Sequence, residues 1–335
     1  MIRTRSFVVE LVLALVFASS ALAGASPAAA IPPPMQSLRD SLRTLARSSD
    51  ANVGIAVEDL ATGAITGYNL NRSMPAASTI KIPVMIEVFR RMARGHFTLG
   101  HVMHLRAEDR DYGSGDLAYA PIGTPITVKR LLGKMIDISD NTAANMLIRL
   151  VGRDRINAAM QFYGCHHTYL RTAIRTNVSS VESNLRTTPL DMLTLLVRMA
   201  RGKLVDAWSS HAMLEILAHQ EIDTLLPEPL PDGTTIAHKT GSLHDVMADV
   251  GIVYEPGAPF AIAAMTSGLP DPQLGRDIVR RASLLSFNAM AQLAEVRATL
   301  GLPNRLAEVI TPAAIPESPD VRYWTGQTLS VGSGG

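Results

Sequence analysis

The spacing of hydrophobic and polar positions alternates between helical and strand periods along the chain. Near the start, apolar residues on one helical face predict a helix; they are Met35, Leu38, Leu42 and Leu45. The stretch NVGIAVEDLATGAITGYNL follows, with two apolar runs on either side of a turn-like EDLATG. This pattern predicts a β-hairpin.

Helical spacing takes over in the middle of the chain. After Lys81, apolar residues recur every three or four positions up to Gly95, a residue that favours a helix C-terminus. Thr127 and Thr188 are predicted N-caps of later helices, and SDNTAANMLIRLVG predicts a short helix ending at Gly152. The stretch SSHAMLEILAHQ is a further helix candidate.

Strand patterns return towards the end of the chain. TTIAHKTGS, ADVGIVYEP and PFAIAAMTS are short apolar runs separated by turns, and a final helix is predicted from about Asp277 to Leu300. Because helices and strands segregate along the chain, the predicted fold class is α+β: an antiparallel sheet flanked by the terminal helices, plus an all-helical lobe. The sheet lobe would comprise about 31–75 and 220–302 and the helical lobe about 76–219, with a ligand site between them.

The two ends of the chain differ in composition from the rest. Residues 1–30 combine two early arginines, the apolar run FVVELVLALVFASSALA and small-residue cleavage sites, as a secretory signal peptide does. An uncleaved membrane anchor is the alternative, although the run is shorter than the roughly 20 residues that a spanning helix needs. Residues 31–302 would form a single catalytic unit, and 303–335, rich in proline, glycine and serine, are predicted to be disordered.

Composition narrows the possible functions. The 335 residues are 47% hydrophobic, enough for a sizeable core, and 31 basic residues nearly balance 30 acidic ones. No block of like charge stands out, so nucleic acid is not an expected partner. Cys165 is the only cysteine, which excludes an internal disulfide, and the run CHH at 165–167 lacks metal-ligand spacing. We therefore expect no metal and no cofactor.

Ser78 and Lys81 are the first candidates for chemistry. Residues three apart share a helix face, so the lysine nitrogen can reach the serine hydroxyl. A serine hydroxyl becomes a good nucleophile only when a base takes its proton, and burial can lower a lysine pKa from about 10.4 far enough for that task. The alternative is a helix cap beside an exposed lysine, because a chance S-x-x-K is common.

Two further motifs favour the catalytic interpretation. SDN at Ser139–Asn141 falls between two predicted helices, and HKTGS at His238–Ser242 falls in a predicted strand. Each alone has an ordinary structural explanation, but their order and separation after Ser78 are specific. From Met35 to about Leu302, the chain resembles the penicillin-recognising serine hydrolases (the β-lactamase/DD-peptidase superfamily), and class A β-lactamases most closely.

The resemblance assigns the catalytic roles. It implies that Ser78 is the acylated nucleophile, that Lys81 is its base and that Ser139 relays a proton to the β-lactam nitrogen. It implies that Asn141 binds the substrate's side-chain amide. The backbone amides of Ser78 and Ser242 would form the oxyanion hole, because two fixed N–H donors stabilise the negative oxygen that develops during acyl transfer.

The KTG motif is assigned to substrate binding on the same grounds. Lys239 would supply positive potential, while Thr240 and Ser242, with Gly241 between them, would bind the substrate carboxylate, as a cation with hydroxyl donors can. Tyr112, in DYGSGDL, stands where the family often has an aromatic wall, although an exposed loop tyrosine is an equal alternative.

The match is weakest at the step that releases the product. Class A enzymes use a glutamate on a long loop, followed four residues later by an asparagine. Here TNVSSVESNLRTTP is shorter, Glu182 is its only acid, and Arg186 stands in place of the asparagine. Glu182 is either the hydrolytic base or an ordinary solvated loop acid, and the choice decides whether the acyl-enzyme turns over.

The predicted function is that of a secreted or periplasmic serine hydrolase that opens β-lactam rings through a Ser78 acyl-enzyme, acting as a monomer on a small-molecule β-lactam. The alternative is a D-alanyl-D-alanine carboxypeptidase, or another hydrolase of peptides or esters, that acts on a peptidoglycan-like peptide and deacylates slowly. A sensor that binds β-lactams covalently and signals through a partner is a third possibility. Turnover of excess β-lactam distinguishes the first from the other two.

Overall fold

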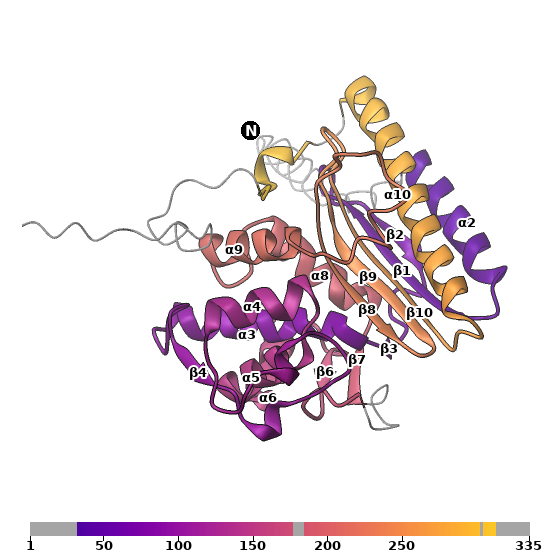
Figure 1. Cartoon of the computed structure of the whole chain (residues 1–335). Helices are drawn as coiled ribbons and strands as arrows, with labels where there is room; N and C mark the ends of the chain where they lie inside the picture. Colours follow the sequence, from indigo (N-terminus) through magenta and orange to yellow (C-terminus); the bar gives the residue numbers. More distant parts are fainter. Residues whose placement is uncertain (1–31, 177–183, 302–303, 313–335) are drawn as a thin grey trace, which may run out of the picture. The chain divides into compact units, whose positions relative to one another are not determined.

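The computed structural model describes residues 32–176, 184–301 and 304–312. In this part of the chain, five antiparallel strands form one sheet in the order β2-β1-β10-β9-β8 (Figure 1). The strands are β1 (Asn52–Asp59), β2 (Ile65–Tyr68), β8 (Ile236–Leu243), β9 (Val246–Val253) and β10 (Phe260–Ser267). The predicted N-terminal hairpin and the three predicted late strands are thereby confirmed.

The pairing of β1 with β10 joins the two ends of the chain. Its register runs from Asn52 opposite Ser267 to Asp59 opposite Phe260 without a break. As a result, β8 lies at one edge of the sheet and β2 at the other. This arrangement confirms that the N-terminal hairpin and the C-terminal strands build one sheet.

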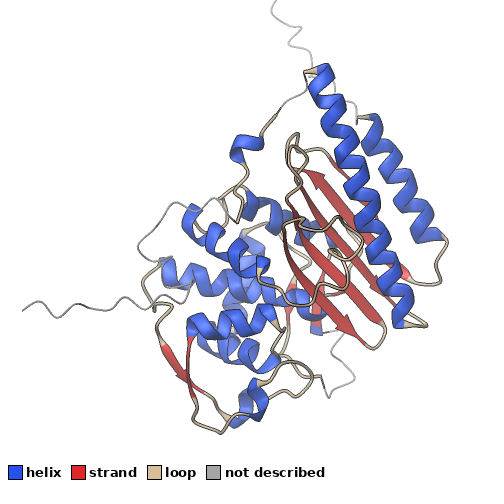
Figure 2. Ribbon diagram, turned by 45° about the horizontal axis from the view of Figure 1, so that its top comes forward, coloured by secondary structure: helices blue, strands red, loops and turns tan. Residues whose placement is uncertain are grey.

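Both faces of the sheet are covered. Helices α2 (Pro33–Arg47) and α10 (Pro272–Leu300) lie side by side over one face (Figures 1 and 2). Phe260 and Ile262 of β10 belong to the apolar cluster beneath these helices, whereas Ala261 and Ala263 belong to the cluster of the helical part. Alternate residues of one strand therefore anchor the two layers, as the period of two in a strand requires.

The helical part packs on the opposite face of the sheet. Its helices are α3 (Lys81–Ala93), α4 (Val128–Asp137), α5 (Asn141–Val151), α6 (Arg153–Phe162), α8 (Pro189–Ala200) and α9 (Ala207–Ala218). The hydroxyls of Thr127 and Thr188 accept hydrogen bonds at the starts of α4 and α8, which confirms both predicted caps. Helix α6, which follows Gly152 directly, was not expected.

Two small sheets within the helical part were also not predicted. One joins β3 (Met74–Pro75), β7 (Leu185–Thr187) and β6 (Tyr169–Leu170), and the other joins β4 (Val102–His104) and β5 (Pro125–Thr127). These strands have only two or three residues, which is too short for a visible alternation of apolar and polar positions. The final helix also begins earlier than predicted, because Asp271 caps it and Pro272 takes its first position.

The chain after α10 differs from the expected disordered tail over residues 304–312. Here η4 (Leu306–Glu308) forms a short 3-10 turn, and Val309 and Ile310 pack against the main core. The Arg305 nitrogen donates to the Ala61 carbonyl at 2.8 Å. Burial of these two apolar side chains offsets the entropy of ordering the segment. The rest of the predicted tail, like the predicted leader at 1–30, lies outside the described residues, so both stay predictions.

No helix in the described ranges is long and apolar enough to cross a membrane. This finding concerns only residues 32–176, 184–301 and 304–312 and does not test the predicted leader.

Candidate active site

Ser78 lies in the short turn that leads into helix α3 and packs against strand β8. The 3-10 turn η1 (Ala77–Ile80) contains it, and α3 begins at Lys81. The regular helix therefore starts two residues before Pro83, within the first turn, where a proline is tolerated. Ala77 has a φ of 45°, a left-handed conformation that is uncommon for alanine and is typical of strained functional positions.

The Lys81 amine joins Ser78 to the SDN motif. Its Nζ lies 3.1 Å from the Ser78 hydroxyl, 3.0 Å from the Ser139 hydroxyl and 2.6 Å from the Ser139 carbonyl oxygen. A fourth contact, also 2.6 Å, reaches Oδ1 of Asn141. The four predicted residues Ser78, Lys81, Ser139 and Asn141 thus meet around one nitrogen.

Burial favours the neutral form of this amine, which is the form that can accept a proton. Lys81 is 0% exposed, and burial, helped by the positive charge of Lys239, lowers the pKa of Lys81 well below its usual value. The carboxylates of Asp140 and Asp111 act in the opposite direction and raise this pKa. A lysine with a strongly lowered pKa can accept a proton near neutral pH, and an exposed lysine cannot.

The SDN motif is held by the turn between α4 and α5. Asp140 is the N-cap of α5, because its Oδ1 accepts the Ala143 backbone N–H at 2.8 Å. Its Oδ2 accepts the backbone N–H groups of Asp116 and Leu117, which ties the motif to the preceding loop. Ser139 has a φ of 58°, a second left-handed residue next to the nucleophile. These contacts aim Ser139 and Asn141 at Lys81.

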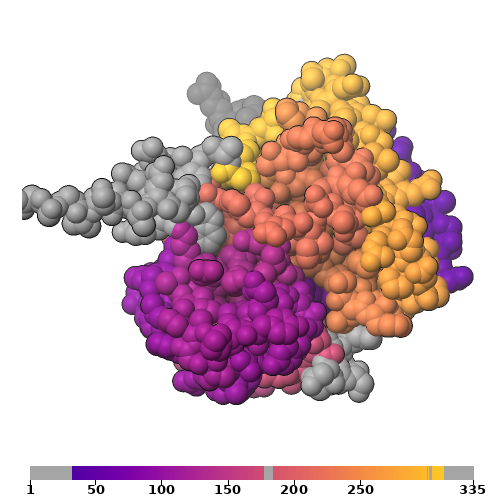
Figure 3. Space-filling view, in the orientation of Figure 1, coloured from indigo at the N-terminus to yellow at the C-terminus, as the bar shows by residue number. Residues whose placement is uncertain are grey.

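Strand β8 forms the opposite wall of the site, and Figure 3 shows the salmon-to-orange part of the chain in contact with the magenta helical part. Gly241 of β8 lies so close to η1 that a Cβ on it would be 3.1 Å from the Ser78 nitrogen and 3.2 Å from the Ala76 carbonyl oxygen. A glycine at this position therefore allows the strand to approach the nucleophile closely. Because β8 is an edge strand, its outer backbone groups face the site.

Lys239 lies beneath this wall with its amine fully buried. Burial lowers the pKa of Lys239 to about 7, while the carboxylates of Asp249 and Asp137 raise it in part. The amine donates to the Thr240 carbonyl oxygen at 3.1 Å. Asp249 is in turn held by the buried His238, whose Nδ1 lies 3.0 Å from both carboxylate oxygens. Lys239 can therefore carry a positive charge next to the site, because the carboxylates of Asp249 and Asp137 favour its charged form.

A small cavity opens between the three motifs. Its lining includes Ser78, Ser139, Asn141, Thr240 and Ser242. Lys81, Lys239 and Gly241 complete the set from below the surface. The structure thus brings together eight of the ten residues predicted for the site; the catalytic and binding roles assigned by resemblance remain predictions.

Two predicted residues do not join this set. Tyr112 is 60% exposed and does not line the cavity. Its ring packs edge-on against that of Tyr119, with 5.5 Å between the ring centroids. Its predicted role in substrate binding stays a prediction. Glu182 lies outside the described residues, so its role stays a prediction. Arg186, which replaces the family's asparagine, donates through Nη2 to the Ser73 carbonyl oxygen.

One acidic residue of the site was missed. Asp111 is 5% exposed and its Oδ1 accepts the Asn141 Nδ2–H at 2.8 Å. In the sequence it stands directly before Tyr112, in a loop without periodicity and outside all three motifs. Only the spatial position of the loop reveals it.

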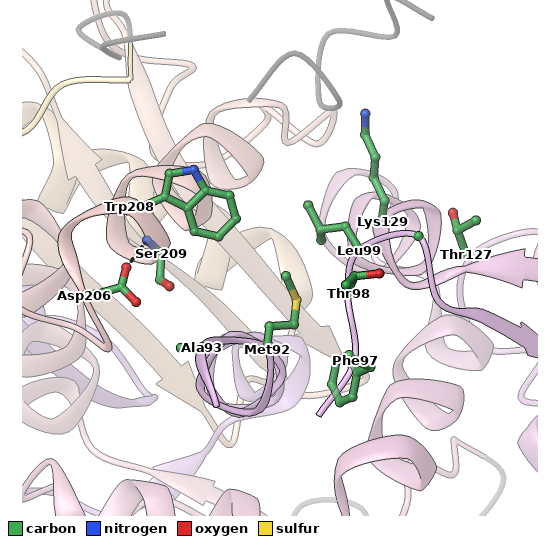
Figure 4. Close-up of a pocket in the computed structure, with 11 residues that line it drawn as sticks. Met92, Ala93, Phe97, Thr98, Leu99, Thr127, Lys129, Asp206, Trp208 and Ser209 are labelled. Carbon is green, nitrogen blue, oxygen red and sulfur yellow. Dashed lines mark hydrogen bonds between the residues drawn. The ribbon is translucent and has the colours of Figure 1, made fainter. Parts of the chain in front are cut away.

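A roomier apolar pocket of about 670 Å³ lies elsewhere (Figure 4). Trp208, Asp206 and Ser209 of the α9 start form one wall and Leu99 and Lys129 the other, over Met92 and Ala93 of α3. None of the predicted site residues lines it. Size alone therefore does not locate the chemistry, which depends on titratable groups that converge.

The described residues contain no group of three or more His, Cys, Asp or Glu side chains arranged to hold a metal ion. The chemistry that the arrangement can perform is nucleophilic: a partly buried hydroxyl, a buried amine of low pKa, a second hydroxyl for proton relay, and a cation behind an edge strand.

Comparisons with known proteins agree with the motifs and the fold. The model of the "Beta-lactamase enzyme family" matches residues 37–290. A β-lactamase of Streptomyces fradiae is 29% identical over 283 residues, which cover 80% of this chain and 91% of that protein.

Solved structures give the same result. The β-lactamase of Sphaerobacter thermophilus is 30% identical and superposes with a TM-score of 0.70, covering 76% of this chain and 97% of that one. PBP-A is 29% identical with a TM-score of 0.73, covering 78% and 99%. The predicted α+β fold of the β-lactamase/DD-peptidase type is confirmed, and the chain belongs to the beta-lactamase enzyme family.

Proposed function

We propose that this protein is a serine β-lactamase that opens β-lactam rings through an ester on Ser78. The observation that carries the proposal is the position of the buried Lys81 amine, within 3.1 Å of the Ser78 hydroxyl and 3.0 Å of the Ser139 hydroxyl. Membership of the family and the named β-lactamase relatives support the same activity.

Acylation would proceed in two proton transfers. Neutral Lys81 takes the hydroxyl proton of Ser78 while the Ser78 Oγ attacks the β-lactam carbonyl carbon. The backbone N–H groups of Ser78 and Ser242 stabilise the oxyanion that forms. The C–N bond then breaks, and the proton passes from Lys81 through the Ser139 hydroxyl to the leaving nitrogen. Two fixed donors suit this step, since removing one donor of an oxyanion hole typically costs about 3 kcal/mol.

Substrate binding would use the remaining groups. The substrate carboxylate would lie against Thr240 and Ser242, with the positive charge of Lys239 behind them. The side-chain amide of the substrate would meet Asn141, whose Nδ2 carries one hydrogen that is not donated to Asp111. Water would finally hydrolyse the ester and regenerate Ser78, with Glu182 proposed as the base for that water.

The direct test is excess nitrocefin with purified protein. We expect many turnovers per enzyme molecule, and we expect Ser78→Ala to abolish them while the variant retains the melting temperature of the wild type to within a few degrees. A wild-type protein that neither turns over nitrocefin nor forms an adduct of the mass of penicillin G would contradict the proposal.

A penicillin-binding peptidase with slow deacylation is the second candidate. The similarity to PBP-A favours it, because a mutant of that protein was solved as an acyl-enzyme complex with penicillin G. This candidate predicts a stable adduct on Ser78 and a single burst of nitrocefin hydrolysis. In the first candidate, Glu182→Ala converts steady turnover into such a burst.

We further propose that the protein is exported and acts as a monomer outside the cytoplasm. The sequence of residues 1–30 supports export, and every group in the proposed mechanism comes from one chain. Cell fractionation of the full-length protein, with detection of a shortened mature form by mass spectrometry, tests the first point. Light scattering of the mature form tests the second.

A further inference from the structure

The hydrogens of the Lys81 amine have obligatory partners. Two of its four contacts, at 2.6 Å each, are the Ser139 carbonyl oxygen and Oδ1 of Asn141, and both atoms can only accept. A neutral amine has two hydrogens and one lone pair. When both hydrogens are donated to these acceptors, the one lone pair is left to accept from either of the other two contacts, the hydroxyls of Ser78 and Ser139.

This arrangement requires one orientation of the Asn141 amide. If the amide turned by half a rotation, its NH₂ group would face Lys81 and could donate to the lone pair. The base would then be occupied by a hydrogen bond and would no longer accept the Ser78 proton. The direction of one amide group therefore decides whether Lys81 can act on the nucleophile.

Asp111 is the group that distinguishes the two orientations. Its Oδ1 accepts the Asn141 Nδ2–H at 2.8 Å, and a carboxylate offers no hydrogen to an amide oxygen. Burial alone would raise the pKa of Asp111, but hydrogen bonds from Thr176, Asn141 and Gly113 outweigh burial and lower it. The carboxyl is therefore ionised at neutral pH and accepts only.

The carboxylate is itself held in place from other segments. The Thr176 backbone N–H donates to Oδ2 at 2.8 Å, and the Thr176 hydroxyl donates to Oδ1 at 2.8 Å. The Gly113 N–H adds a bond of 3.0 Å to Oδ1. All four groups that contact the Asp111 carboxylate are donors: Asn141, Gly113 and the Thr176 hydroxyl meet at Oδ1, and the Thr176 N–H meets Oδ2.

We propose that Asp111 is a positioning residue that locks the Asn141 amide with its oxygen towards Lys81 and so directs the Lys81 lone pair to Ser78. The inference rests on the proposed acylation of Ser78. It adds a residue outside the three motifs, which acts through Asn141 and touches neither the substrate nor the reacting atoms.

The test measures the acylation rate constant at saturating penicillin G, by mass spectrometry of rapidly quenched protein. We expect Asp111→Ala to lower it by about 10- to 100-fold, the effect of one hydrogen bond to a charged group. The pH is set on the alkaline plateau of wild-type acylation, where loss of the Asp111 charge does not change the fraction of neutral Lys81. Asp111→Asn is the matched variant, because its amide oxygen can still accept the three hydrogen bonds at Oδ1, including that of Asn141, and only the Thr176 N–H, opposite the new NH₂ group, loses its acceptor. We expect a rate within about threefold of wild type.

A double-mutant cycle separates positioning from a merely structural role. If Asp111 acts through Asn141, Asp111→Ala has no further effect on the rate in an Asn141→Ala background. Asp109→Asn serves as a stability control: Asp109 lies in the same loop, is 2% exposed and pairs with Arg149, so its loss lowers the melting temperature without changing the rate constant. Should Asp111→Ala fail to fold, Asp111→Ser replaces it, since the shorter hydroxyl cannot reach Nδ2.

The outcomes are distinct. Wild-type protein that neither forms an adduct nor turns over nitrocefin overturns the proposed function. Wild-type protein that is acylated, with an unchanged rate in the alanine or serine variant, overturns the lock alone. Additive effects in the double-mutant cycle also overturn it, because Asp111 would then act independently of Asn141. An asparagine variant as slow as the alanine variant overturns it as well, because the effect would then come from the charge of Asp111.

Discussion

Lys81 and Ser139 are 58 residues apart in the sequence, yet the Lys81 Nζ lies 2.6 Å from the Ser139 carbonyl oxygen and 3.0 Å from its hydroxyl. This contact places the start of α3 against the turn between α4 and α5. It gives Lys81 two neighbours with different capacities: a carbonyl that fixes a hydrogen and a hydroxyl that can pass a proton on. The relay in the proposed mechanism follows from this pair.

Lys81→Ala is expected to lower the acylation rate by about 10²- to 10⁴-fold, the usual contribution of a general base. In the wild type, the lowered pKa of Lys81 keeps the amine neutral at pH values where a free lysine is charged. The acylation rate should therefore stay high well below pH 10 and fall as the pH is lowered through this pKa. The pH dependence of adduct formation measures it; a rate that rises only above about pH 10, the range of an ordinary lysine, would contradict the assignment.

Lys239 is expected to make substrate affinity depend on pH. Burial lowers the pKa of Lys239 to about 7, so the ammonium that attracts the substrate carboxylate is lost as the pH rises above that value. We expect KM for penicillin G to rise by about tenfold from pH 7 to pH 8.5, as the charged fraction falls. The methyl ester of penicillin G, which has no carboxylate, is the control. An equal rise for the ester would assign the effect to another group.

Glu58 is expected to make the folded state less stable at alkaline pH. It is 8% exposed, and burial raises its pKa from 4.5 to about 7, although Arg201 lowers it in part. The folded state thus holds this proton more tightly than the unfolded state, and the free energy of unfolding falls as the pH rises from about 4.5 to 7. Glu58→Gln should therefore increase the stability at pH 8 by about 1–3 kcal/mol and leave it nearly unchanged at pH 4.

Urea unfolding of wild type and variant at both pH values measures this difference. Glu295→Gln, at an exposed position of α10, is the matched control and should change the stability little at either pH. A Glu58→Gln variant with the same stability difference at pH 4 and pH 8 would show that the Glu58 carboxyl has an ordinary pKa.

Cys165 is expected to be inert in the folded protein. It is 0% exposed, and burial next to the negative charge of Asp191 raises its pKa to about 12. A thiol reacts as its thiolate, so Ellman's reagent should modify fewer than about one tenth of the molecules at pH 8 under native conditions and all of them in urea. Rapid native labelling would contradict the packing of this residue.

The sequence predicts long periodic elements and motifs well, for physical reasons. The hairpin of β1 and β2 and the strands β8 to β10 carry clear apolar runs. The threonines that cap α4 and α8 can be recognised in the sequence. Ser78 and Lys81 could be paired in advance because their contact depends on one helical turn.

The residues that were missed depend on tertiary contacts. Asp111 has meaning only because its loop meets Asn141 and Thr176, which lie 30 and 65 residues further along the chain. Strands of two or three residues, such as β6, are formed by pairing and not by their own composition.

The continuous pairing of β1 with β10 has a consequence for how the chain is made. The ribosome synthesises the β1–β2 hairpin first, but β10, which pairs with β1, is made about 200 residues later, since Asp59 pairs with Phe260. Until then, β1 exposes an unpaired edge and an apolar surface, the features that invite misassembly or binding by a chaperone. Closure of this molecule is therefore a late event, and a nascent chain that stalls before β10 would be a ready substrate for quality control.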